Sequence, residues 1–519
     1  MLNEGYSHRP LKEETMMKAV QVLIVGAGPS GLALALGLAK QGIPFRIIDK
    51  LSGPGEQSRA MAVHARTLEF YRQFSFADKV IEMGIPLNRV QVYKDQKLKA
   101  NLQFEDIGEG LSPYPFVLSL GQDDHEQILV KQLEEKGVSV EWDTELISFY
   151  QERDRVYSVT VKDGVEKTNE YAYLCGCDGS HSPVRKGLGF EFPGGTYKQV
   201  FYVADVLSET PIDNPQMSFF EGGFGIAIPI RTTGSLRLVG IVPETLLEQN
   251  EEIEFSQITP YVEENIGLRV SKSNWFSTYK IHHRVSEHFR KERVFIAGDA
   301  GHVHSPAGAQ GMNTGIGDAI NLSWKIASVL QGKADASILD SYEIERGDFA
   351  KKLVTTTDKV FSRIVGEGFA SNVIRDLMIP YIAPVITGFS LVRKRMFKAA
   401  SQIQINYRDS MLSAGVAGSI HGGDRLPWVP LEDGDNFKPL ESFDWQIHVY
   451  GKAKPALREF AKASAYPFYE FPWKEKMKVA GMGRDSMYLI RPDGYVALAN
   501  AGQEVEKIKS FIDQLKINW

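Results

Sequence analysis

Cysteine is scarce in this chain, and so are long apolar runs and any strong excess of one charge. Only two of the 519 residues are cysteine, Cys175 and Cys177. This number excludes a disulfide framework, and a four-ligand zinc site would need other donors nearby. The two cysteines are two positions apart on a predicted strand, so their thiols point to the same face. We expect them to be small buried side chains. So few cysteines are typical of a reducing compartment, and we expect a cytoplasmic protein.

The charge balance and the apolar stretches exclude two further classes. A formal net charge of −6 does not favour a nucleic-acid-binding protein. Residues 19–39 are uncharged, but glycines interrupt them in the middle, and residues 377–392 contain two prolines. We therefore expect no integral membrane segment, and a buried or interface helix pair in the second stretch. Residues 1–17 mix charges without an apolar core, so we expect a disordered extension there and not a secretory signal.

The order of elements near the N-terminus predicts a βαβ unit. Val20 to Val25 is apolar apart from one glutamine, as a buried parallel strand should be. A glycine-rich turn follows, and Leu32 to Lys40 is rich in Ala and Leu and should be helical. Gly42 stops that helix, and Ile43 to Asp49 has the composition of a second strand.

The turn itself matches a dinucleotide-binding fingerprint, with Gly26, Gly28 and Gly31 as its glycines and with Pro29 and Ser30 between them. The first glycine permits a tight turn, the second lets a pyrophosphate approach the backbone, and the third lets helix and strand pack closely. Asp49 ends the second strand, where a carboxylate accepts hydrogen bonds from a ribose hydroxyl and disfavours a 2′-phosphate. Lys50 follows it as a further candidate. The turn alone does not separate FAD from NAD.

Two later segments repeat the pattern of a strand that ends in glycine and aspartate. Residues 175–185 read CGCDGSHSPVR, and residues 298–302 read GDAGH, continuing to GMNTG at 311–315. With the first turn, these segments resemble the single-component FAD-dependent aromatic hydroxylases, the class of p-hydroxybenzoate hydroxylase and phenol hydroxylase. The three segments occur in the order of that family over residues 20–330.

The resemblance implies roles for individual residues. In the family, the aspartate that matches Asp299 holds the ribityl chain of FAD, and the loop around 308–315 lies against the isoalloxazine ring. The remaining candidate FAD-binding residues are Arg59 at the pyrophosphate, Gln122 at the sugar side, Asp178 and Arg185 of the middle segment, and Pro306, Gly311, Met312 and Asn313 of the flavin loop. For Arg185, a structural ion pair with Asp178 stays open.

The sequence departs from the usual family pattern at three positions near the flavin loop. Gly301 replaces an alanine, Ser305 replaces a proline, and Ala309 replaces the second of two glycines. If that second position requires a positive φ, alanine there costs about 1 kcal/mol. His302 and His304 in this region lack the carboxylate spacing of a metal site, so we expect no metal.

The family's chemistry is the oxidation of an aromatic ring. The resemblance implies that NADPH or NADH reduces bound FAD, that O2 then forms a flavin C4a-hydroperoxide, and that this species hydroxylates a phenolic or polycyclic aromatic substrate. No second GxGxxG is present, as expected where the nicotinamide binds only transiently. Candidate pocket walls, for which an ordinary place in the core is the open alternative, are Pro306, Phe219, Phe220, Phe224 and Ile228. Tyr202, His282 and His283 are unranked candidates for the base.

The whole chain is expected to be an α/β protein of three parts. A Rossmann-type FAD-binding domain is interleaved with a β-sheet substrate domain, and the C-terminal segments resemble the hydroxylases that carry a thioredoxin-like α/β domain. That domain has no Cys-x-x-Cys and so no dithiol chemistry. The expected ranges are 18–90, 110–195 and 284–400 for the FAD-binding domain, 91–109 and 196–283 for the substrate domain, 401–430 for a linker, and 431–519 for the thioredoxin-like domain.

Two alternative functions use the same fold. A flavin halogenase would carry a Trp-x-Trp-x-Ile-Pro segment, and none of the seven tryptophans is so arranged. A flavoprotein scaffold or regulator without turnover would keep the FAD-binding segments but consume no NAD(P)H. A homodimer is left open as the assembly.

Overall fold

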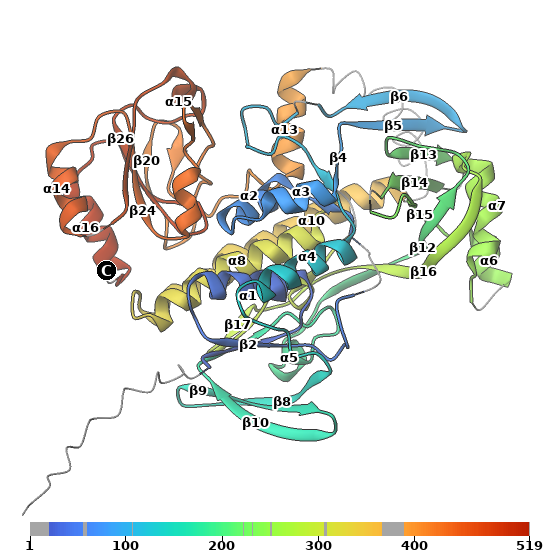
Figure 1. The fold of residues 1–519 in the computed structure, drawn as a ribbon, viewed down its shortest axis with the longest axis horizontal. Helices are drawn as coiled ribbons and strands as arrows, with labels where there is room; N and C mark the ends of the chain where they lie inside the picture. Colours follow the sequence, from blue (N-terminus) through green and yellow to red (C-terminus); the bar gives the residue numbers. More distant parts are fainter. Residues whose placement is uncertain are drawn as a thin grey trace, which may run out of the picture.

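Three units make up the chain in Figure 1, which shows a computed structural model. The structure describes residues 20–55, 60–105, 107–221, 223–230, 232–249, 252–305, 309–365, 389–464 and 466–517. The expected extension over residues 1–17 and most of the stretch 377–392 lie outside these ranges. Within them, no helix has the length and the hydropathy to cross a membrane.

The first unit is built on a five-stranded sheet in the order β17-β18-β11-β1-β2, in which all pairs except β17–β18 are parallel. All four residues of β1 are buried, because helices cover the sheet and parallel strands have no solvated face. Helix α1 packs against α8 and α4, which Figure 1 shows side by side. The elements of this Rossmann unit are β1 (Val22–Val25), α1 (Pro29–Lys40), β2 (Phe45–Ile48), α4 (Gln122–Glu134), β11 (Tyr173–Gly176), α5 (Pro183–Gly187), β17 (Arg290–Lys291), β18 (Val294–Ile296), η1 (Gly298–Ala300) and α8 (Gly311–Leu330).

Smaller elements surround this sheet. A three-stranded antiparallel sheet, β10-β9-β8, lies at the bottom of Figure 1, and β3-β7-β4 forms another short sheet beside α2 and α3. Their bounds are β3 (Ala62–Val63), α2 (Ala65–Gln73), α3 (Ala77–Met83), β4 (Ile85–Pro86), β7 (Leu118–Ser119), β8 (Thr144–Glu152), β9 (Arg155–Lys162) and β10 (Val165–Tyr171). After α8 come η3 (Ala336–Leu339), α9 (Asp340–Tyr342), η4 (Glu343–Gly347), α10 (Asp348–Val365) and α13 (Ser390–Ala400).

The second unit is an eight-stranded, mainly antiparallel sheet in the order β19-β16-β12-β15-β14-β13-β5-β6. Successive side chains of a strand point to opposite faces, so the sheet has two distinct surfaces. Tyr202, Ala204 and Val206 pack on the α7 side, whereas Phe201 packs with Phe361 of α10 on the other. Its elements are β5 (Arg89–Lys94), β6 (Lys97–Gln103), β12 (Gly194–Ser208), β13 (Gln216–Phe220), β14 (Gly223–Pro229), β15 (Leu236–Ile241), α6 (Glu244–Gln249), α7 (Phe255–Ile266), β16 (Val270–Val285) and β19 (His302–Val303).

The third unit is the C-terminal sheet at the left of Figure 1, in the order β21-β20-β27-β26-β24-β25. Residues 401–430, expected to be a linker, contribute β20 and β21 to it, because glycines there let the chain lie against β27. The elements are β20 (Ala414–Ala417), β21 (Ile420–His421), β22 (Pro430–Leu431), β23 (Gly434–Asp435), η6 (Lys438–Ser442), β24 (Gln446–Tyr450), α14 (Pro455–Ala463), β25 (Phe468–Phe471), α15 (Glu475–Val479), β26 (Ser486–Ile490), β27 (Val496–Asn500) and α16 (Val505–Gln514).

Candidate functional site

The first glycine turn joins β1 to α1 with almost no room for side chains. Gly26 has φ +101°, and a Cβ there would lie 2.3 Å from the carbonyl oxygen of Cys177. A Cβ on Gly31 would lie 1.9 Å from the carbonyl oxygen of Gly26. Gly28, in contrast, faces open space, with nothing within 4 Å of its Cβ position. The turn therefore leaves a bare backbone surface at the N-terminus of α1, which suits a pyrophosphate.

Asp49 lies at the end of β2, directly beside this turn. Its carboxylate accepts hydrogen bonds from the backbone N–H of Ala27 at 2.7 Å and of Leu51 at 2.9 Å. The side chain is thus fixed against the glycine turn, and each oxygen keeps a second lone pair for a ribose hydroxyl. Lys50, the next residue, is exposed.

Ser30 is the point at which two of the three segments meet. Cβ atoms built on Gly298 and on Gly315 would each lie 2.3 Å from its Oγ. Gly298 also has φ +62°, so both crowding and backbone conformation require glycine there. Asp299 follows β18 and is exposed at the carboxyl edge of the sheet, the edge at which open α/β sheets bind ligands.

The middle segment contributes two side chains, Asp178 and Arg185, that are held in different ways. Oδ2 of Asp178 accepts from the N–H of Val184 at 2.9 Å, while its buried Oδ1 has no hydrogen-bond partner among the described residues. Burial raises the pKa of this carboxyl. Arg185 instead donates to the carbonyl oxygens of Ala300 and Ser180, both at 2.8 Å. Its guanidinium thus ties the middle segment to the third segment, and the ion pair with Asp178, which the sequence left open as an alternative, is not formed.

The first turn of α8 is held by Asn313. Its Oδ1 accepts from the N–H of His64 at 2.9 Å and from Oγ1 of Thr67 at 2.8 Å. Its Nδ2 donates to the carbonyl oxygens of Ala62 at 2.8 Å and Ala309 at 3.1 Å. The side chain is buried and committed to these bonds. Only the backbone of Asn313 is therefore available to a flavin.

Met312 lies at the end of a buried polar chain. Its sulfur is 3.2 Å from Nδ1 of His125, and Nε2 of the same imidazole is 2.7 Å from the Tyr71 hydroxyl. Burial lowers the pKa of His125 to about 3, so the ring is neutral. A neutral ring satisfies both contacts when the tyrosine donates to Nε2 and Nδ1–H points at the sulfur. Gln122 lies one turn earlier on α4 and donates to Glu126 at 2.8 Å.

The sequence reasoning missed a buried charge cluster behind the third segment. Asp318 of α8 contacts Nε2 of His302 at 2.7 Å, Nε of Arg346 at 2.6 Å and the N–H of Gly298 at 3.1 Å. Burial alone would raise the pKa of Asp318, but the effect of Arg346 and His302 is larger and lowers this pKa. Arg346 also donates to the carbonyl oxygen of Thr314 at 3.0 Å. A charged residue in the apolar run of α8 was the available signal.

The candidate bases lie on different faces of the large sheet. Tyr202 belongs to the α7 side and contacts Gly240 there. His282 bonds Oγ1 of Thr196 at 2.7 Å. His283 faces α10, where its Nδ1 lies 3.4 Å from Oδ1 of Asp358, and the Tyr197 hydroxyl donates to the same oxygen.

The expected pocket walls also separate. Phe219 and Phe224 pack with Phe201 on the α10 side. Phe220, the neighbouring residue of the strand, points to the opposite face and lies beside Gly225 and Ile266 of α7. Ile228 is half-buried on β14. Arg59 and Pro306 lie outside the described residues.

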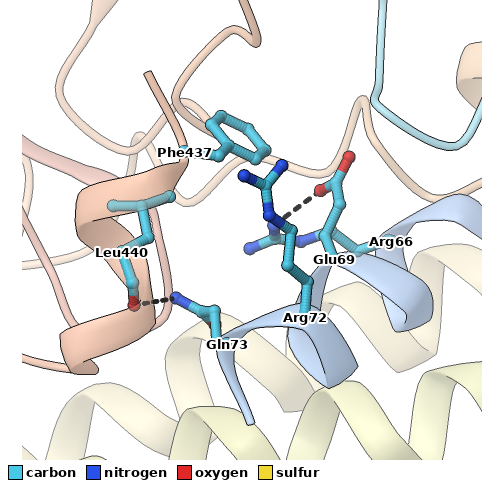
Figure 2. Close-up of a pocket in the computed structure, with 6 residues that line it drawn as sticks. All are labelled: Arg66, Glu69, Arg72, Gln73, Phe437 and Leu440. Carbon is cyan, nitrogen blue, oxygen red and sulfur yellow. Dashed lines mark hydrogen bonds and ion pairs between the residues drawn. The ribbon is translucent and has the colours of Figure 1, made fainter. Parts of the chain in front are cut away.

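A small cavity between α2 and η6 involves none of the predicted site residues (Figure 2). Its lining consists of Arg66, Glu69, Arg72, Gln73, Phe437 and Leu440. Both arginines are paired with carboxylates, by contacts of 2.9 Å to Glu69 and 2.7 Å to Asp435. Its volume of about 10 Å³ suits one water molecule. The cavity belongs to the junction with the C-terminal unit and is no cofactor site.

A Rossmann sheet whose glycine turns meet at one serine defines the class of a dinucleotide-binding protein. The FAD binding domain family model matches residues 19–357, well over half of the chain. Among curated relatives, 6-methylpretetramide 4-monooxygenase of Streptomyces rimosus is 33% identical over 514 residues, 92% of this chain and 90% of its own length. Pentachlorophenol 4-monooxygenase of Sphingobium chlorophenolicum is 30% identical over 423 residues, 79% of this chain and 76% of its own length.

The fold matches solved flavoproteins over almost its whole length. The flavin-dependent monooxygenase PieE, solved with FAD and substrate, superposes with a TM-score of 0.80 at 21% identity and covers 96% of this chain and 99% of its own. The chain therefore belongs to the FAD-binding monooxygenase family, and it is an FAD-dependent enzyme.

Proposed function

We propose that this enzyme hydroxylates a phenolic or polycyclic aromatic substrate with electrons from NADPH or NADH and with O2. The convergence of Gly298 and Gly315 on Ser30 carries this proposal, because it brings the pyrophosphate turn, the ribityl aspartate and the flavin loop into one continuous site. The names of the relatives support an aromatic substrate, since they act on pentachlorophenol and on 6-methylpretetramide.

We infer that FAD is held by the residues that the family resemblance implies, and two atoms that the fold leaves available support this. The open face of Gly28 fits the pyrophosphate. The buried Oδ1 of Asp178 has no hydrogen-bond partner among the described residues and suits a donor from a ligand. Bound FAD supplies the activation of O2. The proposed FAD-binding residues are Gly26, Gly28, Pro29, Ser30, Gly31, Asp49, Lys50, Arg59, Gln122, Asp178, Arg185, Asp299, Pro306, Gly311, Met312 and Asn313.

Purification tests the function directly. The protein should be yellow, or become yellow when FAD is added, and a panel of phenols should stimulate NAD(P)H consumption with one oxygen atom appearing in the product by mass. A colourless protein that FAD does not reconstitute would falsify the proposal. A yellow protein that no phenol stimulates would instead favour the scaffold without turnover.

We propose His283 as the group that receives the proton of the substrate's ring hydroxyl, with Asp358 and Tyr197 beside it. Three observations support this choice over Tyr202 and His282. His283 lies on the aromatic α10 face, its side chain remains 28% exposed, and Asp358 can stabilise the charged ring. Burial and the hydrogen bond to Asp358 raise the pKa of Tyr197 to about 12, so the phenol stays protonated as a donor.

His283→Gln should lower kcat for hydroxylation by about 100-fold at neutral pH while FAD binding stays unchanged. His282→Gln is the matched control, because the neighbouring ring points to the other face and bonds Thr196. A loss of kcat in the His282 variant with none in the His283 variant would reverse the assignment.

We infer that the C-terminal unit has thioredoxin-like topology without redox chemistry. β24, α14 and β25 form a parallel β–α–β arrangement, and the antiparallel pair β26–β27 and α16 follow. Both cysteines of the chain are on or beside β11 of the Rossmann unit. We infer that the role of this unit is structural, through its contacts with the Rossmann unit, such as that of Arg491 with Glu345.

A further inference from the structure

His304 presents one nitrogen that no described residue uses. Its Nδ1 is 2.8 Å from the carbonyl oxygen of Ser305, and a carbonyl only accepts, so Nδ1 carries the proton. Nε2 is then an acceptor. It is buried and has no hydrogen-bond partner among the residues that the structure describes. A buried acceptor without a partner is costly, which indicates that a ligand completes it.

The free nitrogen points at the beginning of α8. A Cβ built on Gly311, the first residue of this helix, would lie 3.7 Å from Nε2. Glycine at this position leaves that space free. The N-terminus of α8 has no side-chain cap and no acidic residue in its first turn, and its first internal hydrogen bond runs from Thr314 N–H to the carbonyl oxygen of Gln310. The N–H groups before Thr314 therefore remain available as donors.

Donors and one acceptor thus lie side by side on this surface. The isoalloxazine ring of FAD has an imide edge on which two carbonyl oxygens flank one N–H, at N3. Backbone N–H groups of a helix N-terminus suit the carbonyl oxygens. The N3–H needs an acceptor between them, and this pattern of two acceptors around one donor is specific to the imide edge, whereas a phenol or a water presents a single oxygen.

Resting on the proposed FAD site, the geometry points to His304 as the residue that accepts a hydrogen bond from N3–H of bound flavin through Nε2. Burial lowers the pKa of His304 to about 4, which keeps the ring neutral and its lone pair available at physiological pH. Ser305, whose hydroxyl lies 3.4 Å from the carbonyl oxygen of Thr357 on α10, holds the carbonyl that fixes the tautomer.

Binding of FAD and of FAD methylated at N3 to the apoprotein tests this contact without turnover, by quenching of flavin fluorescence. The wild-type protein should bind the methylated analogue at least about tenfold more weakly. His304→Leu should bind FAD about three- to tenfold more weakly than wild type and should no longer distinguish the two flavins. His304→Gln should keep most of the preference, because its amide oxygen accepts a hydrogen bond. His288→Leu, at a half-exposed surface histidine, is the control and should bind both flavins like wild type.

Equal binding of both flavins by the wild type would overturn the assignment without any substitution, and would leave only a water at Nε2. Retention of the full preference in His304→Leu would overturn it as well. So would a His304→Leu protein that binds a phenolic substrate more weakly but binds FAD like wild type. None of these results contradicts the proposed function, because the protein would still bind FAD and consume NAD(P)H. Failure of the wild-type apoprotein to bind any FAD is the separate result that removes the proposed function.

Discussion

Ala309 shows what a single residue does to the flavin loop. It has φ +50°, so the conditional expectation for this position is met: alanine occupies the left-handed region. The strain of that conformation amounts to about 1–2 kcal/mol. Ala309→Gly removes it but makes the unfolded chain more flexible, so we expect a net gain of about 0.5–1 kcal/mol in the free energy of unfolding.

Urea denaturation of the apoprotein checks this gain. Ala399→Gly is the matched control, because Ala399 is exposed on α13, where glycine should cost about 1 kcal/mol. The two substitutions should therefore shift stability in opposite directions. Equal losses in both variants would mean that no strain is relieved at Ala309.

The side chain of Asn313 positions helix α8, and its amide N–H donors matter more than its shape. Asn313→Asp keeps the Oδ1 acceptor but replaces Nδ2 with an oxygen that faces the carbonyl oxygens of Ala62 and Ala309. We expect a loss of about 1–3 kcal/mol in stability and weaker FAD binding, since buried acceptors then confront one another. Titration of the apoprotein with FAD measures the second effect. Asn265→Asp on α7, where the part-buried amide donates to the carbonyl oxygen of Tyr261 in the same helix, is the control and should cost less than about 1 kcal/mol and leave FAD binding unchanged.

Local elements of the fold were predictable, and their long-range partners were not. The strand, turn and helix around Gly26 follow from neighbouring residues, so the spacing of glycines and apolar residues predicts them. The bond between Arg185 and Ala300 joins residues 115 positions apart, and no local pattern contains it. Phe219 and Phe220 are neighbours on one strand, so their side chains point to opposite faces, and composition alone does not say which of the two faces α10. Residues 414–421 read as linker because glycines that allow close packing also occur in loops.

At the scale of the whole molecule, buried charges join the C-terminal unit to the Rossmann unit. Arg491 contacts both oxygens of Glu345 at 2.7 and 2.9 Å, and Lys325 of α8 lies 2.8 Å from the same carboxylate. Burial would raise the pKa of Glu345, but Arg491 and Lys325 lower it below its usual range. The desolvated carboxylate therefore depends on a residue of the other unit.

Arg491→Leu should lower the free energy of unfolding by about 3–5 kcal/mol, because it leaves Glu345 short of one of its two cations in a buried site. Arg458→Leu in the same unit breaks the exposed pair with Glu470 and should cost less than about 1 kcal/mol. Chemical denaturation compares the two. Similar costs would show that the two units are stabilised independently of this contact.

The pH dependence of stability follows from histidines that fold as neutral rings. Burial lowers the pKa of His125 and His448 to about 3 and that of His304 to about 4, from 6.5. Below pH 6.5 the unfolded chain binds protons at these rings and the folded chain does not. The contribution of these rings to the free energy of unfolding is therefore fully present above pH 6.5, and it is lost as the pH decreases toward 4. Each ring costs about 2 kcal/mol at pH 5.

His448 isolates this effect, because it lies in the C-terminal unit, where Gln446 and Tyr450 contact its two nitrogens. Between pH 7 and pH 5, His448→Gln should lose about 2 kcal/mol less than wild type, since one proton-binding site of the unfolded chain is gone. Taking the difference between the two proteins cancels the contribution of every carboxyl group. Tyr450→Phe removes a neighbouring hydroxyl that does not titrate in this range, and its loss should parallel that of wild type. Parallel losses in all three proteins would mean that His448 takes up a proton in the folded state.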